Sequence, residues 1–141
     1  MGKLLIVIIL FFVVWDVVWW VLGVKPLLPW QLRRRLDSGT SPAPLLLDVR
    51  TPLEYNWFHL PGAQNRPDLL LDDRAMPMVA PNQEVVVICM TGHRSPFVSR
   101  ALKKRGFPRV YNLTWGMVGW KLYEWISNAS GRPEPPQNQK L

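Results

Sequence analysis

The apolar residues of this chain fall into one long run and several short ones. The long run is Leu4–Val24, 21 residues that carry one charge, Asp16. Three short runs follow, within Leu45–Arg50, Val85–Cys89 and Arg109–Leu113. Short continuous apolar runs between turn residues are typical of strands buried on both faces. The pattern predicts an apolar helix followed by a buried sheet.

Helical patterns alternate with the predicted strands. Thr51 and Ser95 are suitable N-caps, each followed by proline at the first helical position, and Gly106 ends the second of these helices. Strands alternating with helices predict an α/β domain with a mainly parallel sheet. The predicted helical segments are Gln31–Asp37, Thr51–Phe58, Asp68–Met78, Ser95–Arg105 and Trp115–Ser127.

These elements divide the chain into three parts. Residues 1–29 are predicted to be a membrane anchor with a proline-broken connector, and residues 30–131 a folded domain. About 100 residues are enough for a domain with its own core. Residues 132–141 are polar and rich in proline, which predicts a disordered tail.

The N-terminal run is long enough to cross a membrane. A 21-residue helix is about 31 Å long, close to the roughly 30 Å of a bilayer's hydrocarbon core. Asp16 costs about 2.5–3.5 kcal/mol there, which the surrounding Leu, Ile, Val and Phe side chains offset. We therefore expect an uncleaved single span; a cleaved signal peptide and an interfacial helix are the alternatives.

Charge predicts the orientation of this span. Lys25 and the cluster Arg33–Arg35 outnumber Lys3, which places the folded domain on the cytoplasmic side of the cell (inner) membrane. Asp16 shares a helix face with Trp19 and Trp20, and this face either meets a membrane-protein partner or is simply tolerated in the bilayer.

Composition narrows the function classes. Seventeen Lys and Arg against ten Asp and Glu give a net charge of +7, but no nucleic-acid-binding motif accompanies it. The lone cysteine, Cys89, excludes an intramolecular disulfide and a cysteine-rich metal site. We expect no metal, no organic cofactor and no nucleic acid partner.

Cys89 ends a predicted buried strand, just before a predicted helix. The helix N-terminus, the charge of Arg94 and the amides of the intervening loop would each favour a thiolate over a thiol. Gly92 permits the positive φ that a tight loop needs. We expect an ionised and accessible thiol, the alternative being a small buried apolar side chain.

Three stretches of the chain resemble single-domain rhodaneses. The sequence CMTGHRS (Cys89–Ser95) resembles their active-site loop, Cys-x-x-Gly-x-Arg-Ser. The sequence LLLDVRTPLEYNWFHLPGAQN resembles their Asp-Val-Arg…Glu-Tyr…His-Ile-Pro-Gly-Ala-x-Asn segment, and VYNLTWGMVGW their closing Leu-x-Gly-Gly-x-x-x-Trp element. The resemblance covers about residues 30–131 and implies a rhodanese-like parallel sheet flanked by helices.

The resemblance implies a sulfurtransferase. Cys89 would take the outer sulfur of a donor such as thiosulfate, hold it as a persulfide and pass it to a thiol or cyanide. Because the chain has no second cysteine, the acceptor must be external, a small thiol or a protein. The resemblance assigns Asp48 and Arg50 to support of the loop, and substrate binding to Met90, Thr91, Gly92, His93, Arg94 and Ser95.

The chain departs from the family pattern at two positions. Phe58 stands where a glycine usually precedes the turn histidine, His59, and Trp115 replaces the first glycine of the closing pair. Trp115 is therefore a candidate for the pocket entrance. The resemblance gives structural roles to His59, Glu54 and Trp120.

Two other functions are alternatives to sulfur transfer. Related cysteine phosphatases have five residues between cysteine and arginine, whereas four separate Cys89 from Arg94, a smaller cradle that suits sulfur better than phosphate. A catalytically idle adaptor that binds membrane-protein partners is the other alternative.

Overall fold

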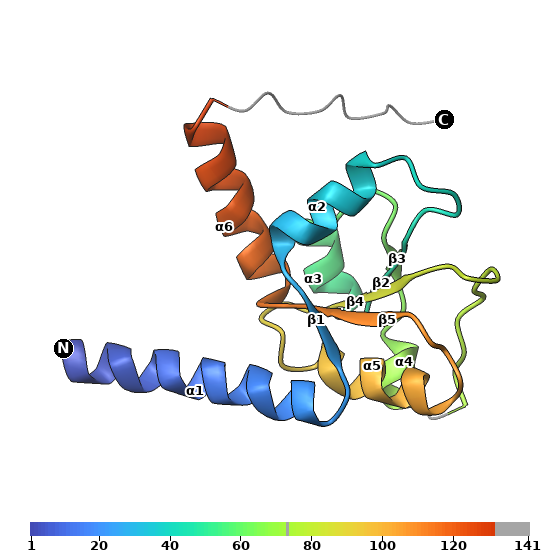
Figure 1. The fold of residues 1–141 in the computed structure, drawn as a ribbon, viewed down its shortest axis with the longest axis horizontal. Helices are drawn as coiled ribbons and strands as arrows, with labels where there is room; N and C mark the ends of the chain where they lie inside the picture. The colour runs from blue at the N-terminus through green and yellow to red at the C-terminus, as the bar shows by residue number, and fades with distance from the viewer. Residues whose placement is uncertain (73, 132–141) are drawn as a thin grey trace.

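The computed structural model describes residues 1–72 and 74–131 of the chain. Within them, five parallel strands form one sheet in the order β1-β5-β4-β2-β3 (Figure 1). The parallel α/β sheet predicted from the sequence is confirmed. The strands are β1 (Lys25–Leu27), β2 (Leu45–Asp48), β3 (Gln64–Asn65), β4 (Val85–Ile88) and β5 (Val110–Leu113).

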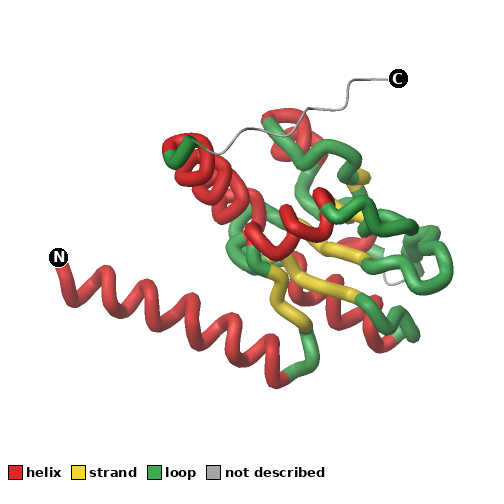
Figure 2. The backbone as a smooth tube through the Cα atoms, turned by 45° about the horizontal axis from the view of Figure 1, so that its top comes forward, coloured by secondary structure: helices red, strands yellow, loops and turns green. Residues whose placement is uncertain are grey.

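Helices cover both faces of the sheet. Helices α2, α3 and α6 lie on one face, and α4 and α5 lie on the other (Figure 1). Helix α1 runs outward from the edge where β1 lies, as the tube view also shows (Figure 2). The helices are α1 (Gly2–Val21), α2 (Pro29–Asp37), α3 (Pro52–Trp57), α4 (Asp68–Leu71), α5 (Ser95–Lys104) and α6 (Gly116–Ala129).

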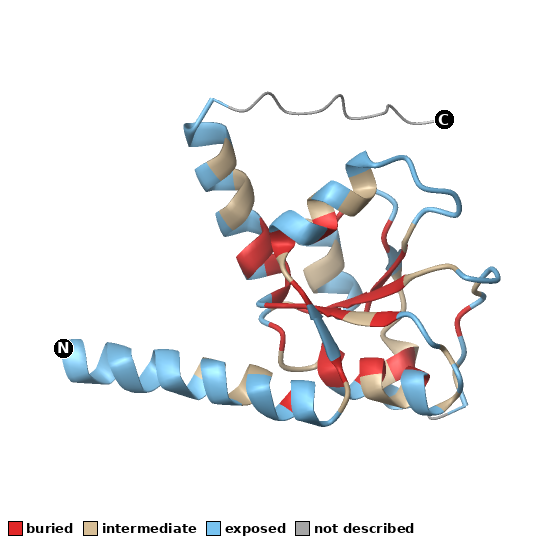
Figure 3. Ribbon diagram, viewed as in Figure 1, coloured by how far each residue is buried: buried red, intermediate tan, exposed pale blue. Residues whose placement is uncertain are grey.

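The core consists of two apolar layers separated by the sheet. Because side chains alternate along a strand, β4 sends Val86 and Ile88 to one layer and Val87 to the other. Leu32 of α2 and Trp120 of α6 complete the first layer, which confirms Trp120 as a core residue. All residues of β2 and β4 are buried, as expected for central parallel strands (Figure 3).

Two short strands lie where the sequence predicts none. Lys25–Leu27, assigned to the connector, pairs with β5 at the sheet edge, where the missing N–H of Pro26 is tolerated. Gln64–Asn65, within a turn-rich stretch, pairs with β2. The sheet therefore takes in residues on the N-terminal side of the predicted domain boundary at residue 30.

Two helix predictions were too long or shifted. Helix α4 ends at Leu71 because the Asp72 carboxylate accepts a hydrogen bond from the Arg74 amide, a local turn that competes with the helix. Helix α5 begins at Ser95, so Arg94 and not Ser95 occupies the N-cap. The predicted disordered tail, residues 132–141, lies outside the described residues.

Helix α1 has the length and apolar composition of a membrane span, and its N-terminal position equally suits a signal sequence. Much of its surface is exposed and apolar (Figure 3). One side nevertheless packs on the domain: the ring centroid of Trp19 lies 4.7 Å from that of Phe97 on α5. Trp20 is exposed, so Trp19 and Trp20 do not share one environment.

Candidate active site

Cys89 follows β4 directly, at the carboxyl end of the central strand. Its side chain is fully buried and belongs to the apolar layer that includes Val98 and Leu102 of α5. The expectation of an accessible thiol was therefore wrong for this conformation. Packing by α5 buries the sulfur, and this contact is not visible in the local sequence.

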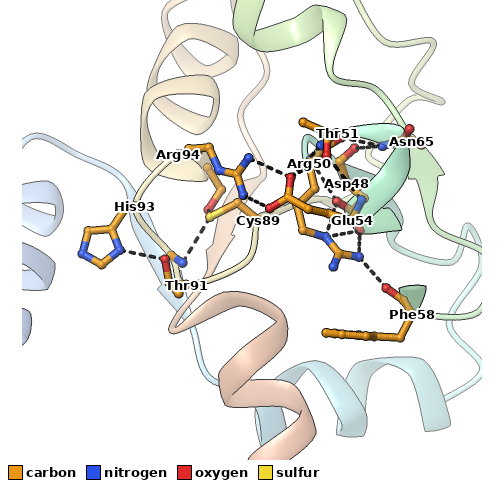
Figure 4. A network of polar contacts seen from close by, with 12 residues as sticks. Asp48, Arg50, Thr51, Glu54, Phe58, Asn65, Cys89, Thr91, His93 and Arg94 are labelled. Carbon is orange, nitrogen blue, oxygen red and sulfur yellow. Dashed lines mark hydrogen bonds and ion pairs between the residues drawn. The ribbon is translucent and has the colours of Figure 1, made fainter. Parts of the chain in front are cut away.

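Two polar groups nevertheless contact the sulfur (Figure 4). The Gly92 amide donates a hydrogen bond to Cys89 Sγ over 3.1 Å, and Ser95 Oγ lies 3.2 Å from it. Gly92 has φ +84°, the left-handed conformation for which a glycine is favoured. The loop thus turns a main-chain donor toward the sulfur, as the sequence predicts.

Asn112 of β5 is a site residue that the sequence analysis missed. Its Oδ1 lies 2.5 Å from Ser95 Oγ, and both residues are buried. A hydroxyl has one proton, so Ser95 can donate either to Asn112 or to the sulfur. The position of Asn112 in the sequence could have indicated its role. It lies near the carboxyl end of β5, which pairs with β4, and the carboxyl ends of neighbouring parallel strands meet at one edge of the sheet.

The start of α6 holds the other side of the loop. The amides of Met117 and Val118 donate to the carbonyl oxygens of Cys89 and Met90, over 2.9 and 3.0 Å. A Cβ on Gly116 would lie 2.3 Å from the Cys89 oxygen. Only glycine fits there, so the one glycine that this chain keeps of the family's closing pair seats the loop.

Trp115 packs its main chain against the loop. A Cβ at Gly92 would lie 3.0 Å from the Trp115 nitrogen, so the two backbones are in close contact. Trp115 itself has φ +60°, where glycine is the usual residue. The backbone is therefore left-handed at the position of the family motif's first glycine, although a large aromatic side chain occupies it.

Arg94 is paired with a carboxylate. Its guanidinium donates to both oxygens of Glu54 on α3, over 3.0 and 2.5 Å (Figure 4). Hydrogen bonding from Arg94, together with donors from Thr51, lowers the pKa of Glu54 to about 2. Glu54 thus balances much of the Arg94 charge, and, after the hydrogen bonds to Glu54, an electrostatic interaction with Cys89 also contributes to raising the pKa of Arg94.

Asp48 and Arg50 form a fully buried ion pair at the end of β2. Arg50 Nε and Nη2 donate to the Asp48 carboxylate over 2.7–3.1 Å, and Nη2 also donates to the Phe58 carbonyl over 2.7 Å. Between them, the Val49 amide donates to the carbonyl of Ile88, the residue before Cys89. The pair therefore anchors the strand that carries the cysteine.

Two of the remaining loop residues, Thr91 and His93, lie toward α1. Thr91 Oγ1 lies 2.9 Å from Nδ1 of His93. The His93 ring lies 5.2 Å, between centroids, from both Phe12 and Trp15 of α1, so it is not simply turned to solvent. Met90 is half-buried against the layer beneath α6.

The turn that precedes β3 has a structural role. The His59 ring stacks on Tyr55, with centroids 3.9 Å apart, and its Nδ1 lies 2.9 Å from the Tyr55 carbonyl oxygen. Phe58 is fully extended, so no glycine is required at that position. In the described residues, no cluster of three or more His, Cys, Asp or Glu side chains is suited to a metal ion.

The geometry supports chemistry at an anionic sulfur. A thiolate or a persulfide anion at position 89 would receive a hydrogen bond from the fixed Gly92 amide and, when the Ser95 proton turns from Asn112 to the sulfur, a second one from the Ser95 hydroxyl. Hydrogen bonds to an ion are about twice as strong as those between neutral groups. The loop is therefore suited to a sulfur nucleophile.

Comparisons with known proteins agree with this description. The chain is 38% identical over 93 residues to the probable adenylyltransferase/sulfurtransferase MoeZ of Mycobacterium tuberculosis, covering 65% of this chain but only 23% of that protein. It is 32% identical over 112 residues to the thiosulfate sulfurtransferase GlpE of Pseudomonas fluorescens, covering 78% and 96% of the two chains.

A solved structure has the same fold. The rhodanese-like domain of the Anabaena protein Alr3790 aligns with a TM-score of 0.59 and 26% identity, covering 83% of this chain and 90% of that one. The sequence model of the rhodanese-like domain matches residues 29–123, about two thirds of the chain. The chain belongs to the rhodanese-like domain family.

Proposed function

We propose that this protein is a membrane-attached sulfurtransferase that works through a persulfide on Cys89. The Cys89 thiolate attacks the outer sulfur of a donor such as thiosulfate, a new S–S bond forms, and sulfite leaves with the electron pair of the broken bond. The extra sulfur, held as an anion, then passes to a thiol acceptor. No metal or organic cofactor takes part in either step.

One observation carries the proposal: the sulfur of the family's loop cysteine has an amide at 3.1 Å and a hydroxyl at 3.2 Å. These donors are suited to the thiolate that attacks and to the persulfide that results. Because the sulfur is buried, the donor reaches it only when the loop or its cover moves. Attachment through α1, with the domain on the cytoplasmic side, is part of the same proposal.

Turnover tests this function. The full chain, incubated with thiosulfate and cyanide, is expected to form thiocyanate, and Cys89→Ser is expected to form none. Ser99→Ala is the control, since the Ser99 hydroxyl is buried on α5, the helix that follows the Cys89 loop, without a hydrogen-bond partner in the described residues. Equal rates from the wild-type chain and Cys89→Ser would contradict the proposal.

The idle adaptor remains a second candidate because of one observation. Cys89 has no exposed surface, and the His93 ring of its loop packs against α1. A site that is closed to substrate in this way is consistent with an inactive domain. An adaptor predicts a folded chain that forms no thiocyanate and gains no sulfur from thiosulfate.

A further inference from the structure

A cleft lies between α1 and α6, beside the catalytic loop. Its volume is about 330 Å³, within the range of small-ligand sites. The lining is almost wholly apolar, with Thr91 of the loop and Asp16 of α1 as the polar exceptions. The apolar wall consists of Ile9, Phe12 and Val13 of α1, of Trp115, which is the N-cap of α6, and of Val118, Gly119 and Leu122 of α6.

The cleft is built against the groups that hold the reacting sulfur. The Trp115 nitrogen would be only 3.0 Å from a Cβ at Gly92, and the Gly92 amide donates to Cys89 Sγ. The Val118 amide donates to the Met90 carbonyl, next to the cysteine. Thr91 is the loop residue that lines the cleft, so a molecule bound there contacts the loop two residues from Cys89.

The cleft continues along α6 toward apolar surface. A second cavity of about 260 Å³ shares Trp115, Gly119 and Leu122 and extends to Trp30 of α2. Val118 and Leu122 are each half-exposed. The exposed sides of α1 and α6 that flank the cleft are apolar as well, so its mouth opens among groups that favour hydrocarbon over water.

We propose that this cleft binds the hydrocarbon part of the sulfur acceptor, an apolar thiol drawn from the membrane. The inference rests on the proposed function. The acceptor thiolate attacks the outer sulfur of the Cys89 persulfide and forms a new S–S bond. The bond to Cys89 Sγ breaks, and its electron pair returns to Cys89 as a thiolate, so that the product is an alkyl persulfide.

This occupant follows from the lining. Glutathione-like acceptors carry several charges, and an almost wholly apolar wall offers those charges no partners. An alkyl chain instead gains affinity for each methylene removed from water. A single cysteine also requires that the acceptor come from outside the chain.

The test uses the full chain in phospholipid nanodiscs, loaded with thiosulfate and then mixed with ethanethiol, butanethiol or hexanethiol. Loss of the persulfide is followed by intact mass. We expect the transfer rate constant to rise up to about fourfold per added methylene, the factor that corresponds to burial of one CH₂. The double variant Val13→Asn/Leu122→Asn, at two lining residues that do not hold the loop, should lose this dependence and keep its loading with thiosulfate.

Trp125→Asn is the matched control, since Trp125 is an exposed residue of α6 outside both cavities. It should keep the wild-type dependence on chain length. Thiols partition into the nanodisc equally for all variants, so partition alone would give every variant the same dependence of rate on alkyl-chain length. If the double variant kept the wild-type dependence, the cleft would not be the binding site, and the proposed function would still stand. Failure of the wild-type chain to load would overturn both proposals.

Discussion

Two polar groups contact the Cys89 sulfur, and only one of them belongs to a side chain. The Gly92 amide is part of the main chain, whereas the Ser95 hydroxyl can be removed by substitution. The partner of Ser95, Asn112, lies on the neighbouring strand and holds the hydroxyl in place. Ser95 is therefore the residue at which the contribution of a single hydrogen bond can be measured.

Ser95→Ala should slow sulfur loading from thiosulfate by roughly 10–100-fold, since a hydrogen bond to a charged group contributes about 1.5–3 kcal/mol. The rate is measured by quenched mass spectrometry of the full chain. Ser99→Ala, one turn along α5, should load at the wild-type rate. An unchanged rate in Ser95→Ala would show that the hydroxyl does not assist the thiolate.

Glu54 makes the free energy of unfolding of the chain depend on pH. Its folded-state pKa of about 2 lies below the ordinary value of 4.5, so the folded state holds this proton less tightly than the unfolded state. The stabilisation is complete above pH 4.5 and is lost as the pH falls through 2. Glutamine at position 54 could still cap α3, so Glu54→Gln removes chiefly the charge.

Glu54→Gln should lower the Tm at pH 7 by roughly 1–5 °C, as expected for a partly exposed ion pair. The difference from the wild-type chain should shrink toward zero between pH 4.5 and 2, as measured by circular dichroism. Glu124→Gln, in the exposed pair with Lys121, is the control and should have the smaller effect at pH 7. A difference that stayed constant down to pH 2 would contradict the assigned pKa.

Among the elements, the start of α6 makes very close contact with the carbonyl oxygens of the Cys89 loop. Gly116 and Gly39 both have positive φ, +54° and +62°, but only Gly116 faces the loop carbonyls, whereas the space beside Gly39 is open. Gly39→Ala should therefore cost only the left-handed backbone term, about 1–2 kcal/mol. Gly116→Ala should cost clearly more, because its Cβ overlaps the Cys89 oxygen.

Chemical denaturation of the two variants, followed by thiosulfate loading, measures both effects. Gly39→Ala should load like the wild-type chain, and Gly116→Ala should load poorly even under conditions where it is folded. If the two variants lose equal stability and load equally, α6 does not position the Cys89–Ser95 loop.

The central elements could be predicted from sequence because each carries its own signal. The apolar runs of β2, β4 and β5 and the motif Cys89–Ser95 are local patterns. Strand β1 was missed because Pro26 argues against a strand, and only its pairing with β5 makes it one. Asn112 and the burial of Cys89 depend on which elements pack together, and no single segment encodes that.

At the scale of the whole molecule, the position of α1 on the domain determines whether this helix can also span a membrane. Ring contacts with the domain run from Phe11 to Trp19, and Ile9 also lines the cleft against α6, so the segment Gly2–Ile8 lies beyond these contacts. Seven helical residues are about 10 Å long, well below a bilayer's roughly 30 Å core. If α1 stays docked on the domain it cannot also span a membrane, so the docked arrangement corresponds to the interfacial helix and the undocked one to the single span.

Surface labelling distinguishes these arrangements. In sealed vesicles with the domain outside, a membrane-impermeant amine reagent should modify Lys3 as well as Lys104, because a docked α1 keeps both on one side. Peptide mass mapping gives the extent of modification at each lysine. Protection of Lys3 until the vesicles are permeabilised would show that α1 spans the bilayer and that the α1–α6 cleft does not persist there.

The capacity of position 89 to carry a transferable sulfur is tested most directly by the intact mass of the full chain after incubation with thiosulfate. We expect a gain of one sulfur atom that a reductant removes and that Cys89→Ser does not show. A folded wild-type chain whose mass stays unchanged at saturating thiosulfate would contradict the assignment of Cys89 as the sulfur carrier.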